Sequence, residues 1–247
     1  MILGLLWGLY SVARSVIGLD TGQAFVNARR VLSFQEWLGL GIEAQIQAML
    51  PWKPALMVAN SYYLLHFPVT LGLLAWTYYT DRHDGFVRFR NALIAATAVG
   101  LLIHVAFPLA PPRMLSGFTD TGAIIGPDPY SVPGASKANQ FAAMPSMHVA
   151  WAILVARAAA SGVARPFRHL ASLHPVLTAI VVVVTANHYV IDVLIGAALA
   201  YIAVLACSTA ASRQPPAPTW SSTMYTGHGP PIPVMERATR PTEHIYL

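Results

Sequence analysis

The chain has 247 residues, of which 55% are hydrophobic and only 10% are charged. An ordinary soluble domain carries about 25% charged residues, so this composition excludes a typical soluble enzyme, a coiled coil and a disordered chain. The net charge of +5 does not indicate nucleic-acid binding, because the basic residues are spread thinly along the chain. The single cysteine, Cys207, excludes an intramolecular disulfide and a thiolate metal site. The composition predicts an all-α integral membrane protein.

Hydropathy along the chain predicts six transmembrane helices, because six stretches approach the ~20 apolar residues that a spanning helix needs. They are residues 1–19, 54–79, 91–109, 145–163, 171–187 and 189–207. The first is the weakest, because Arg14 interrupts it. We therefore expect residues 1–212 to form one membrane-embedded domain and the proline-rich residues 213–247 to form a disordered cytoplasmic tail.

Residues 23–50 combine charged and apolar side chains. This mixture predicts two short amphipathic helices that lie at the membrane surface. The run Ser33-Phe-Gln-Glu36 has the form of a capping box, so a new helix is expected to begin there.

The distribution of arginine predicts how the spans are oriented. Arginines gather in residues 80–90, around the loop after the fourth span and in the tail, which alternation places on one side. That side is predicted to be the cytoplasmic face of the plasma membrane and to hold both termini. The opposite, extracytoplasmic side then receives residues 20–53, the loop of residues 110–144 and the turn at His188.

His188 and Asp192 lie one helical turn apart at the start of the last span, and therefore on one face of it. A carboxylate in that position can accept the Nδ1–H of the imidazole and leave Nε2 free as a nucleophile. Ionisable side chains inside a membrane span are functional by default. The alternative is a structural pair that joins two helices.

Three more polar residues are predicted on the same side of the membrane. Ser146 lies at the start of the fourth span, where free backbone N–H groups bind phosphate and the hydroxyl adds a donor. His148 is placed to protonate a leaving oxygen, and Arg113 is suited to clamp phosphate oxygens. Singly, these residues are also explained by a capped helix, an interfacial histidine and an arginine that reaches lipid headgroups. Together they indicate phosphoryl transfer.

The Pro-Ser-Met-His string that ends at His148, followed by the His-x-x-x-Asp string that ends at Asp192, resembles the type 2 phosphatidic acid phosphatase superfamily. Its members are six-helix, metal-independent enzymes that act through a phosphohistidine. The resemblance implies His188 as nucleophile, Asp192 as the residue that orients it and His148 as general acid. It also implies Ser146 and Arg113 as phosphate-binding residues, with no metal and no cofactor.

The chain departs from the usual signature of that superfamily, which is Lys-x6-Arg-Pro, Pro-Ser-Gly-His and Ser-Arg-x5-His-x3-Asp. Ala106 stands at the Lys position, Val181 and Val182 at the Ser-Arg positions, and Met147 at the Gly position. The strings around both motifs are similar to those of inositol phosphorylceramide synthases and their bacterial relatives. Fungal members of that branch move a phosphoinositol headgroup from a phospholipid to a lipid alcohol. Their phosphodiester donor carries one negative charge at the phosphate, so fewer positively charged side chains are needed to bind it.

Four further residues are candidates for headgroup binding. Asn60, Tyr63 and His66 recur at intervals of three in the second span, where polar side chains either bind ligand or join helices. Lys137 lies in the outer loop, where it either reaches phosphate or remains solvated. His174 is expected near the cytoplasmic side and unrelated to the site.

The sequence therefore predicts a membrane-embedded lipid phosphotransferase with a phospholipid substrate. The alternative is a phosphatase that hydrolyses phosphatidate, phosphatidylglycerol phosphate or a polyprenyl phosphate by the same mechanism. A non-enzymatic membrane protein is less well supported, because the chain shows no inverted hydropathy repeat. A further alternative is a zinc-dependent hydrolase, in which two outer histidines and one aspartate would bind the metal. The sequence does not define the oligomeric state.

Overall fold

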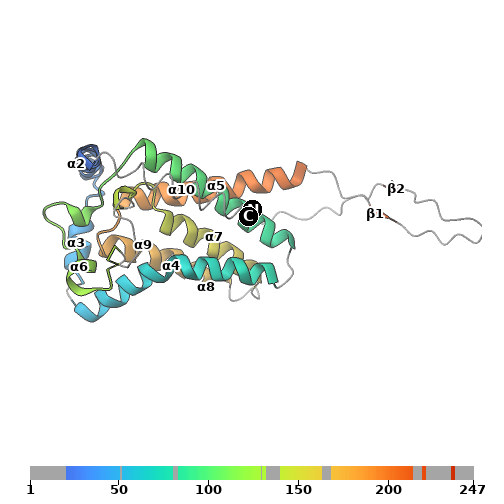
Figure 1. Cartoon of the computed structure of the whole chain (residues 1–247), viewed down its shortest axis with the longest axis horizontal. Coiled ribbons are helices and arrows are strands. Elements are labelled where there is room, and N and C mark those ends of the chain that lie inside the picture. Colours follow the sequence, from blue (N-terminus) through green and yellow to red (C-terminus); the bar gives the residue numbers. More distant parts are fainter. Residues whose placement is uncertain are drawn as a thin grey trace, which may run out of the picture. The chain divides into compact units, whose positions relative to one another are not determined.

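The computed structural model describes residues 21–50, 52–79, 83–128, 130–131, 140–162, 168–213, 219–220 and 235–236. The first predicted span, residues 1–19, lies outside these ranges. The helices are α2 (Thr21–Trp37), α3 (Glu43–Ala48), α4 (Lys53–Tyr79), α5 (His83–Ala106), the 3₁₀ turn η1 (Pro112–Met114), α6 (Thr121–Ile125), α7 (Met147–Gly162), α8 (Arg168–Ala171), α9 (Leu173–Val184) and α10 (Val190–Arg213) (Figure 1). The predicted all-α fold class is confirmed for this part of the chain.

The bundle is formed by α4, α5, α7, α9 and α10, which correspond to the second to sixth predicted spans. Helix α7 packs against α4, α5 and α9. Alanines of α5, α7 and α10 form one core cluster, as expected for membrane helices that approach closely through small side chains. Valines of α9 pack against α4 and the start of α7 in a second cluster.

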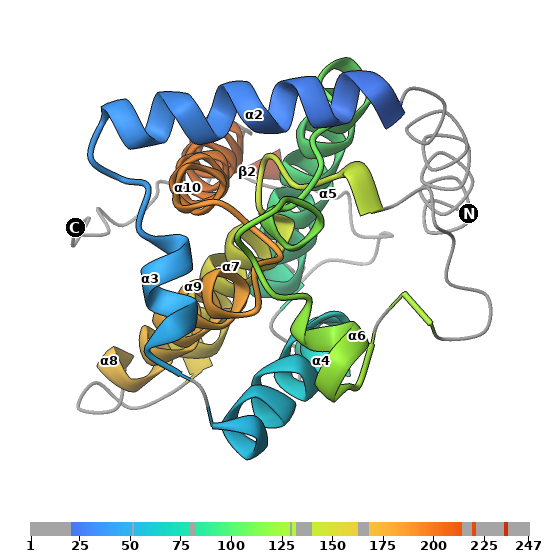
Figure 2. The ribbon, with the colours of Figure 1, turned by 90° about the vertical axis from the view of Figure 1, so that its left-hand side faces the viewer.

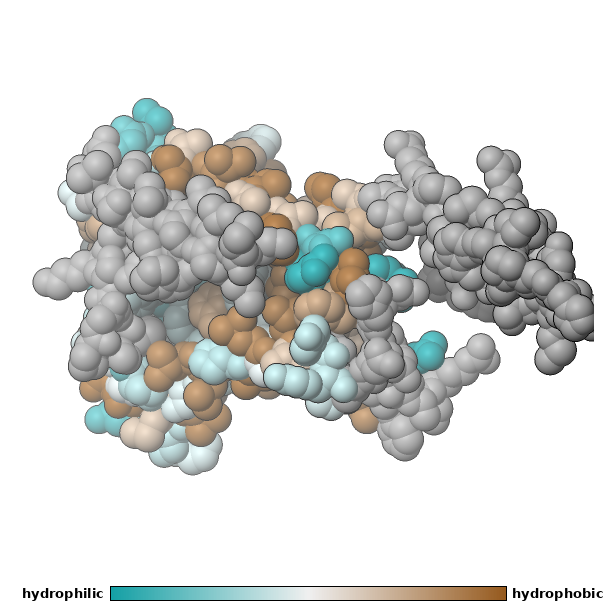
Figure 3. Space-filling view, turned by 45° about the vertical axis from the view of Figure 1, so that its right-hand side comes forward, coloured by the Kyte–Doolittle hydropathy of each residue, from teal (hydrophilic) through white to brown (hydrophobic). Residues whose placement is uncertain are grey.

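Two of these helices are long and apolar enough to cross a membrane, as judged by length and composition. They contain the segments Gly85–Ala106 of α5 and Val190–Ser208 of α10. The segments Met147–Ala160 and Arg168–Val184 are shorter apolar helices. Large apolar side chains such as Leu102 point outward from the bundle, and the space-filling view shows apolar residues over much of the described surface (Figure 3). Six membrane crossings therefore remain a prediction.

Helix α2 runs across one end of the bundle, roughly perpendicular to α5 and α10 (Figures 1 and 2). Its buried alanines pack on the loop after α5 and on Tyr189. The predicted helix start at Ser33 is wrong, because α2 continues through that residue to Trp37. The helix ends at Trp37, and Gly39, whose φ of 72° suits glycine, closes it in a Schellman motif in which the amide of Leu40 donates to the Gln35 carbonyl. Tertiary packing therefore overrides the local capping pattern.

The residues from Ser208 onward form a separate compact unit. Two short strands, β1 (Thr219–Trp220) and β2 (Met235–Glu236), pair there in antiparallel register. Most of the predicted disordered tail, residues 213–247, lies outside the described residues, and its disorder remains a prediction.

A glycine allows a close approach between α10 and the segment that leads into α7. A Cβ on Gly196 of α10 would collide with the backbone carbonyl group of Ser146, which precedes α7, and would lie 3.1 Å from its carbonyl carbon. The obstacle is backbone, so it cannot rotate away as a side chain does. Gly72 of α4, by contrast, has nothing within 4 Å of the same position.

We predict that Gly196→Ala lowers the free energy of unfolding by about 1–3 kcal/mol, because the added methyl overpacks a rigid contact. Gly72→Ala is the matched control and is expected to stabilise the protein by about 0.5 kcal/mol through helix propensity. Thermal unfolding of both variants in detergent micelles measures the difference. Equal melting temperatures for the two variants would contradict the close contact.

Candidate active site

Three segments that are distant in sequence meet at the end of the bundle that α2 crosses. They are η1, the start of α7 and the turn between α9 and α10. This arrangement brings together the five residues predicted to carry the chemistry, and each is less than 10% exposed. They are Arg113, Ser146, His148, His188 and Asp192.

The imidazole of His188 is held by a backbone carbonyl. Nδ1 lies 2.8 Å from the carbonyl oxygen of Ala143 and 3.6 Å from Oδ2 of Asp192. Because a carbonyl oxygen only accepts, Nδ1 carries the proton and donates it to Ala143. Nε2 is then the nitrogen with a free lone pair, as predicted. The predicted orienting partner, Asp192, is close to the ring, but Ala143 makes the shorter contact.

The carboxylate of Asp192 is fully buried and organises the turn that precedes it. Its Oδ2 accepts a hydrogen bond of 3.0 Å from the backbone N–H of Tyr189. Oδ1 has no partner among the described residues. The Tyr189 hydroxyl donates to the Ala110 carbonyl at 3.0 Å, which ties this turn to the loop that carries Arg113.

Glu43 supports the same turn from α3, and the sequence analysis did not single it out. Its Oε1 accepts from the backbone N–H of Val190 at 2.8 Å and from Nε2 of Gln35 at 2.6 Å. Val190 is the first residue of α10, whose amide lacks an intrahelical partner. Glu43 therefore caps the helix that follows His188, although it lies far away in sequence and is 1% exposed.

The guanidinium of Arg113 is fixed on several sides but keeps one free donor. One terminal nitrogen donates to Oδ1 of Asn187 at 3.1 Å, and Nε lies 3.5 Å from Oδ2 of Asp120. The Tyr130 ring covers it at 4.1 Å. Nη2 is buried without a partner among the described residues. A fixed guanidinium with an unused buried donor is suited to bind an oxygen anion.

The two histidines face each other across the site. The rings of His148 and His188 lie 5.8 Å apart in a T-shaped arrangement. The backbone of Tyr63 hydrogen bonds to His148, while Nε2 of His148 has no partner. The Tyr63 ring stacks on His148 at 4.0 Å. Both histidines therefore have one nitrogen anchored to backbone and Nε2 uncommitted.

Ser146 occupies the N-terminal cap of α7. Its backbone N–H donates to the Asp192 carbonyl at 3.0 Å. Its Oγ lies 3.5 Å from the Val149 amide, which is a long contact, so the hydroxyl is little used by the cap. The Ser146 hydroxyl and the first amides of α7 form a natural anion-binding helix end.

The residues predicted to bind the headgroup are divided by the structure. Tyr63 and His66 lie beside His148. The Asn60 amide is occupied by the α6 segment, since it donates to the Thr121 carbonyl at 3.0 Å and accepts from the Thr121 hydroxyl at 2.9 Å. Lys137 lies outside the described residues. Tyr130, Glu43 and Tyr189 contribute to the site without having been predicted, because no motif marks them.

We predict that Glu43→Ala lowers the free energy of unfolding by about 2–4 kcal/mol, since it leaves two buried donors unpaired. Glu43→Gln retains an oxygen that accepts from both donors and is expected to lose less than half as much. Denaturant unfolding in detergent, followed by tryptophan fluorescence, compares the two variants. Equal losses would show that the negative charge, rather than the acceptor geometry, holds the turn.

Comparisons with known proteins identify the family of the chain. The chain has no match among curated proteins or among solved structures. Residues 29–206 match the PAP2 superfamily, in its PAP2_3 family. This match covers well over half of the chain and includes every residue of the candidate active site. The chain therefore belongs to the PAP2 superfamily.

Proposed function

We propose that the chain is a lipid phosphotransferase that moves a phosphoryl headgroup, of the phosphoinositol kind, from a phospholipid to a lipid alcohol. Enzymes of the PAP2 superfamily are metal-independent phosphatases and phosphotransferases that act on phosphate esters, often lipids. The observation that carries the finer proposal is the low positive charge of the site among the residues that the structure describes. It supports a branch similar to inositol phosphorylceramide synthases and their bacterial relatives.

Among the described residues, the site has fewer positively charged side chains than the usual superfamily signature provides. The guanidinium of Arg113 is partly compensated by the carboxylate of Asp120. Val182 stands where the signature has arginine, and it is fully buried among apolar neighbours. Its carbonyl holds the amides of Asn187 and His188, so its backbone serves the turn directly. A phosphodiester carries one negative charge and a phosphomonoester up to two, so this site matches a diester better.

The chemistry begins with the lone pair of His188 Nε2. It attacks phosphorus in line, so that a P–N bond forms as the P–O bond to the leaving alcohol breaks. Protonated His148 gives its proton to that alcohol and later takes the proton of the incoming lipid alcohol. Arg113 Nη2, the Ser146 hydroxyl and the first amides of α7 bind the non-bridging oxygens. The second alcohol then displaces His188 and forms the new phosphodiester.

The membrane position is part of the same proposal. Two helices qualify as spans, and members of this family are usually membrane proteins. Trp37 and Trp52 are strongly exposed at the end of the bundle that holds the site. Exposed tryptophans are typical of the aromatic belt at a membrane interface. The site is proposed to face the extracytoplasmic side of the plasma membrane, with the termini in the cytoplasm.

The test offers the purified protein phosphatidylinositol, phosphatidate or a polyprenyl phosphate in mixed micelles, each with and without a lipid alcohol. We expect a new phosphodiester lipid, detected by mass spectrometry, that depends on the alcohol. Release of inorganic phosphate from monoesters, indifferent to the alcohol, would overturn the transferase and establish the phosphatase. Chelator is expected to leave the rate unchanged.

His188→Ala is expected to abolish turnover, because it removes the Nε2 lone pair that attacks phosphorus, while His148 is used as the acid and base. Size-exclusion chromatography and thermal unfolding verify that this variant is folded. Turnover retained in the folded variant would overturn the phosphohistidine mechanism for the transferase and for the phosphatase.

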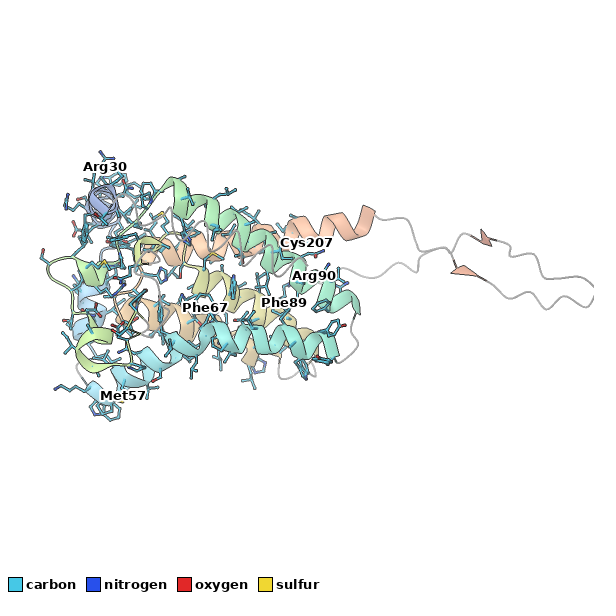
Figure 4. The ribbon with its side chains drawn as sticks, viewed as in Figure 1. Arg30, Met57, Phe67, Phe89, Arg90 and Cys207 are labelled. Carbon is cyan, nitrogen blue, oxygen red and sulfur yellow. The ribbon has the colours of Figure 1, made fainter. Side chains whose placement is uncertain are left out.

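Arg113→Lys tests the phosphate clamp. Lysine keeps the charge but loses the planar fork that holds Asn187 and presents Nη2, so kcat/KM is expected to fall about 10²-fold. Arg90→Lys is the matched control, because Arg90 lies away from α2 along α5 and hydrogen bonds to its neighbour Asn91 (Figure 4). Unchanged kcat/KM in Arg113→Lys would show that charge alone suffices.

A further inference from the structure

The side chains of the candidate active site are joined in a closed ring of contacts. The Arg113 guanidinium lies 4.1 Å from the Tyr130 ring, and the Tyr130 hydroxyl lies 3.3 Å from the Tyr63 hydroxyl. The Tyr63 ring stacks on His148, whose ring lies 5.8 Å from that of His188. The side chain of the residue before His188 accepts from Arg113 at 3.1 Å and closes the ring. The proposed mechanism uses both histidines and the arginine but gives the two tyrosines no role.

Two polar atoms on this ring indicate that a ligand completes it. Arg113 Nη2 and His148 Nε2 are buried and have no partner among the described residues. Their side chains are only 7% and 6% exposed, and buried polar groups are almost always hydrogen bonded. The hydroxyls of Tyr63 and Tyr130 lie between these two side chains along the ring. A ligand that reaches both nitrogens therefore lies beside the two hydroxyls.

The contact between the two tyrosine hydroxyls is loose. Their oxygens are 3.3 Å apart, whereas hydroxyl groups that bond well are separated by about 2.7–2.8 Å. A phenolic hydroxyl both donates and accepts. An alcohol of a ligand can therefore accept from one tyrosine and donate to the other. The weak contact between Tyr63 and Tyr130 is then replaced by two stronger ones.

The carboxylates of the outer loop distinguish between kinds of headgroup. Residues 110–144 contain two of them, Asp120 and Asp128. Asp120 caps α6 with one oxygen and faces Arg113 with the other. Asp128 accepts from the Tyr130 amide at 2.9 Å and from a serine hydroxyl three residues further on. An amine headgroup would need a carboxylate, and both are already engaged, whereas a neutral headgroup with hydroxyls needs none.

We propose that Tyr130, together with Tyr63, binds hydroxyl groups of the donor lipid's headgroup and thereby selects a polyhydroxylated headgroup. The inference rests on the proposed function, in which the headgroup stays on phosphorus through both displacements. The hydroxyl pair therefore holds the same group in the donor, in the phosphohistidine and in the product. Selection at this pair acts through hydrogen bonds and adds no charge to the site.

The first test measures binding in the His188→Ala protein, so that no turnover takes place. Phosphatidylinositol and phosphatidylmethanol are both phosphodiesters with one negative charge, but only the first has hydroxyls on its headgroup. Native mass spectrometry of the protein in detergent, titrated with each lipid, gives the two affinities. We expect phosphatidylinositol to bind at least about tenfold more tightly. Equal affinities would overturn the inference, and failure of the proposed transferase would be seen separately in the turnover assay.

The second test introduces Tyr130→Phe into the same protein. This change removes the hydroxyl and keeps the ring over Arg113, so phosphatidylinositol is expected to bind about five- to tenfold more weakly. The affinity for phosphatidylmethanol is expected to remain within about twofold. Tyr63→Phe, which keeps the stacking on His148, is expected to show the same selective loss.

Tyr201→Phe is the matched control, because it removes the same hydroxyl from a tyrosine of α10 that is 62% exposed. Both affinities are expected to stay unchanged in this variant. A merely structural role for the tyrosine pair would weaken both lipids alike. Equal weakening of the two lipids, or unchanged affinities, in Tyr130→Phe and Tyr63→Phe would overturn the inference.

Discussion

The contact between the start of α7 and the start of α10 sets the geometry of the whole site. The Ser146 amide donates to the Asp192 carbonyl, and Gly196 lets the two backbones approach until they touch. This contact fixes the distance between the helix that carries His148 and the turn that carries His188. The proposed mechanism requires such a spacing, because both imidazoles must reach one phosphorus. Everything else at this end of the bundle supports that contact or uses it.

The turn between α9 and α10 shows how a non-helical backbone is tolerated in a largely apolar bundle. Lipid offers no hydrogen bonds, so irregular segments must find partners within the protein. The amides of the turn are satisfied by Val182, Asp192 and Glu43 in succession. Ala186 adopts a φ of 53°, and its carbonyl accepts from the Arg113 amide. His188 and Arg113, the proposed nucleophile and phosphate clamp, are thus held by the same few residues.

Much of this organisation could be predicted from sequence. Apolar segments of helical length located the helices of the bundle, and alternation placed His148, His188 and Arg113 at the same end of it. These predictions succeed because the length of an apolar segment and the alternating direction of successive helices can both be read directly from the sequence.

Other parts depend on contacts between distant residues and could not be predicted. Glu43 caps α10 across most of the chain, and a single buried carboxylate in an amphipathic segment carries no motif. The contact of His188 Nδ1 with the Ala143 carbonyl is invisible in a sequence, because any residue could provide that oxygen. Ser33 had the right local pattern for a helix start, but the packing of α2 on the site loop continued the helix through it. The ring contact between His66 and His174 likewise arises only when α4 and α9 pack.

The contact between Met147 and Gly100 couples the choice of residue at two positions that are distant in sequence. Met147 stands where the usual signature has glycine, and its thioether lies where a side chain on Gly100 of α5 would begin. The methionine therefore fits only opposite a residue without a Cβ, unless its flexible end moves aside. A glycine at position 147, as in the usual signature, would remove this contact and leave room for a side chain at position 100. The residues at positions 100 and 147 are therefore coupled, because a larger side chain at one requires a smaller one at the other.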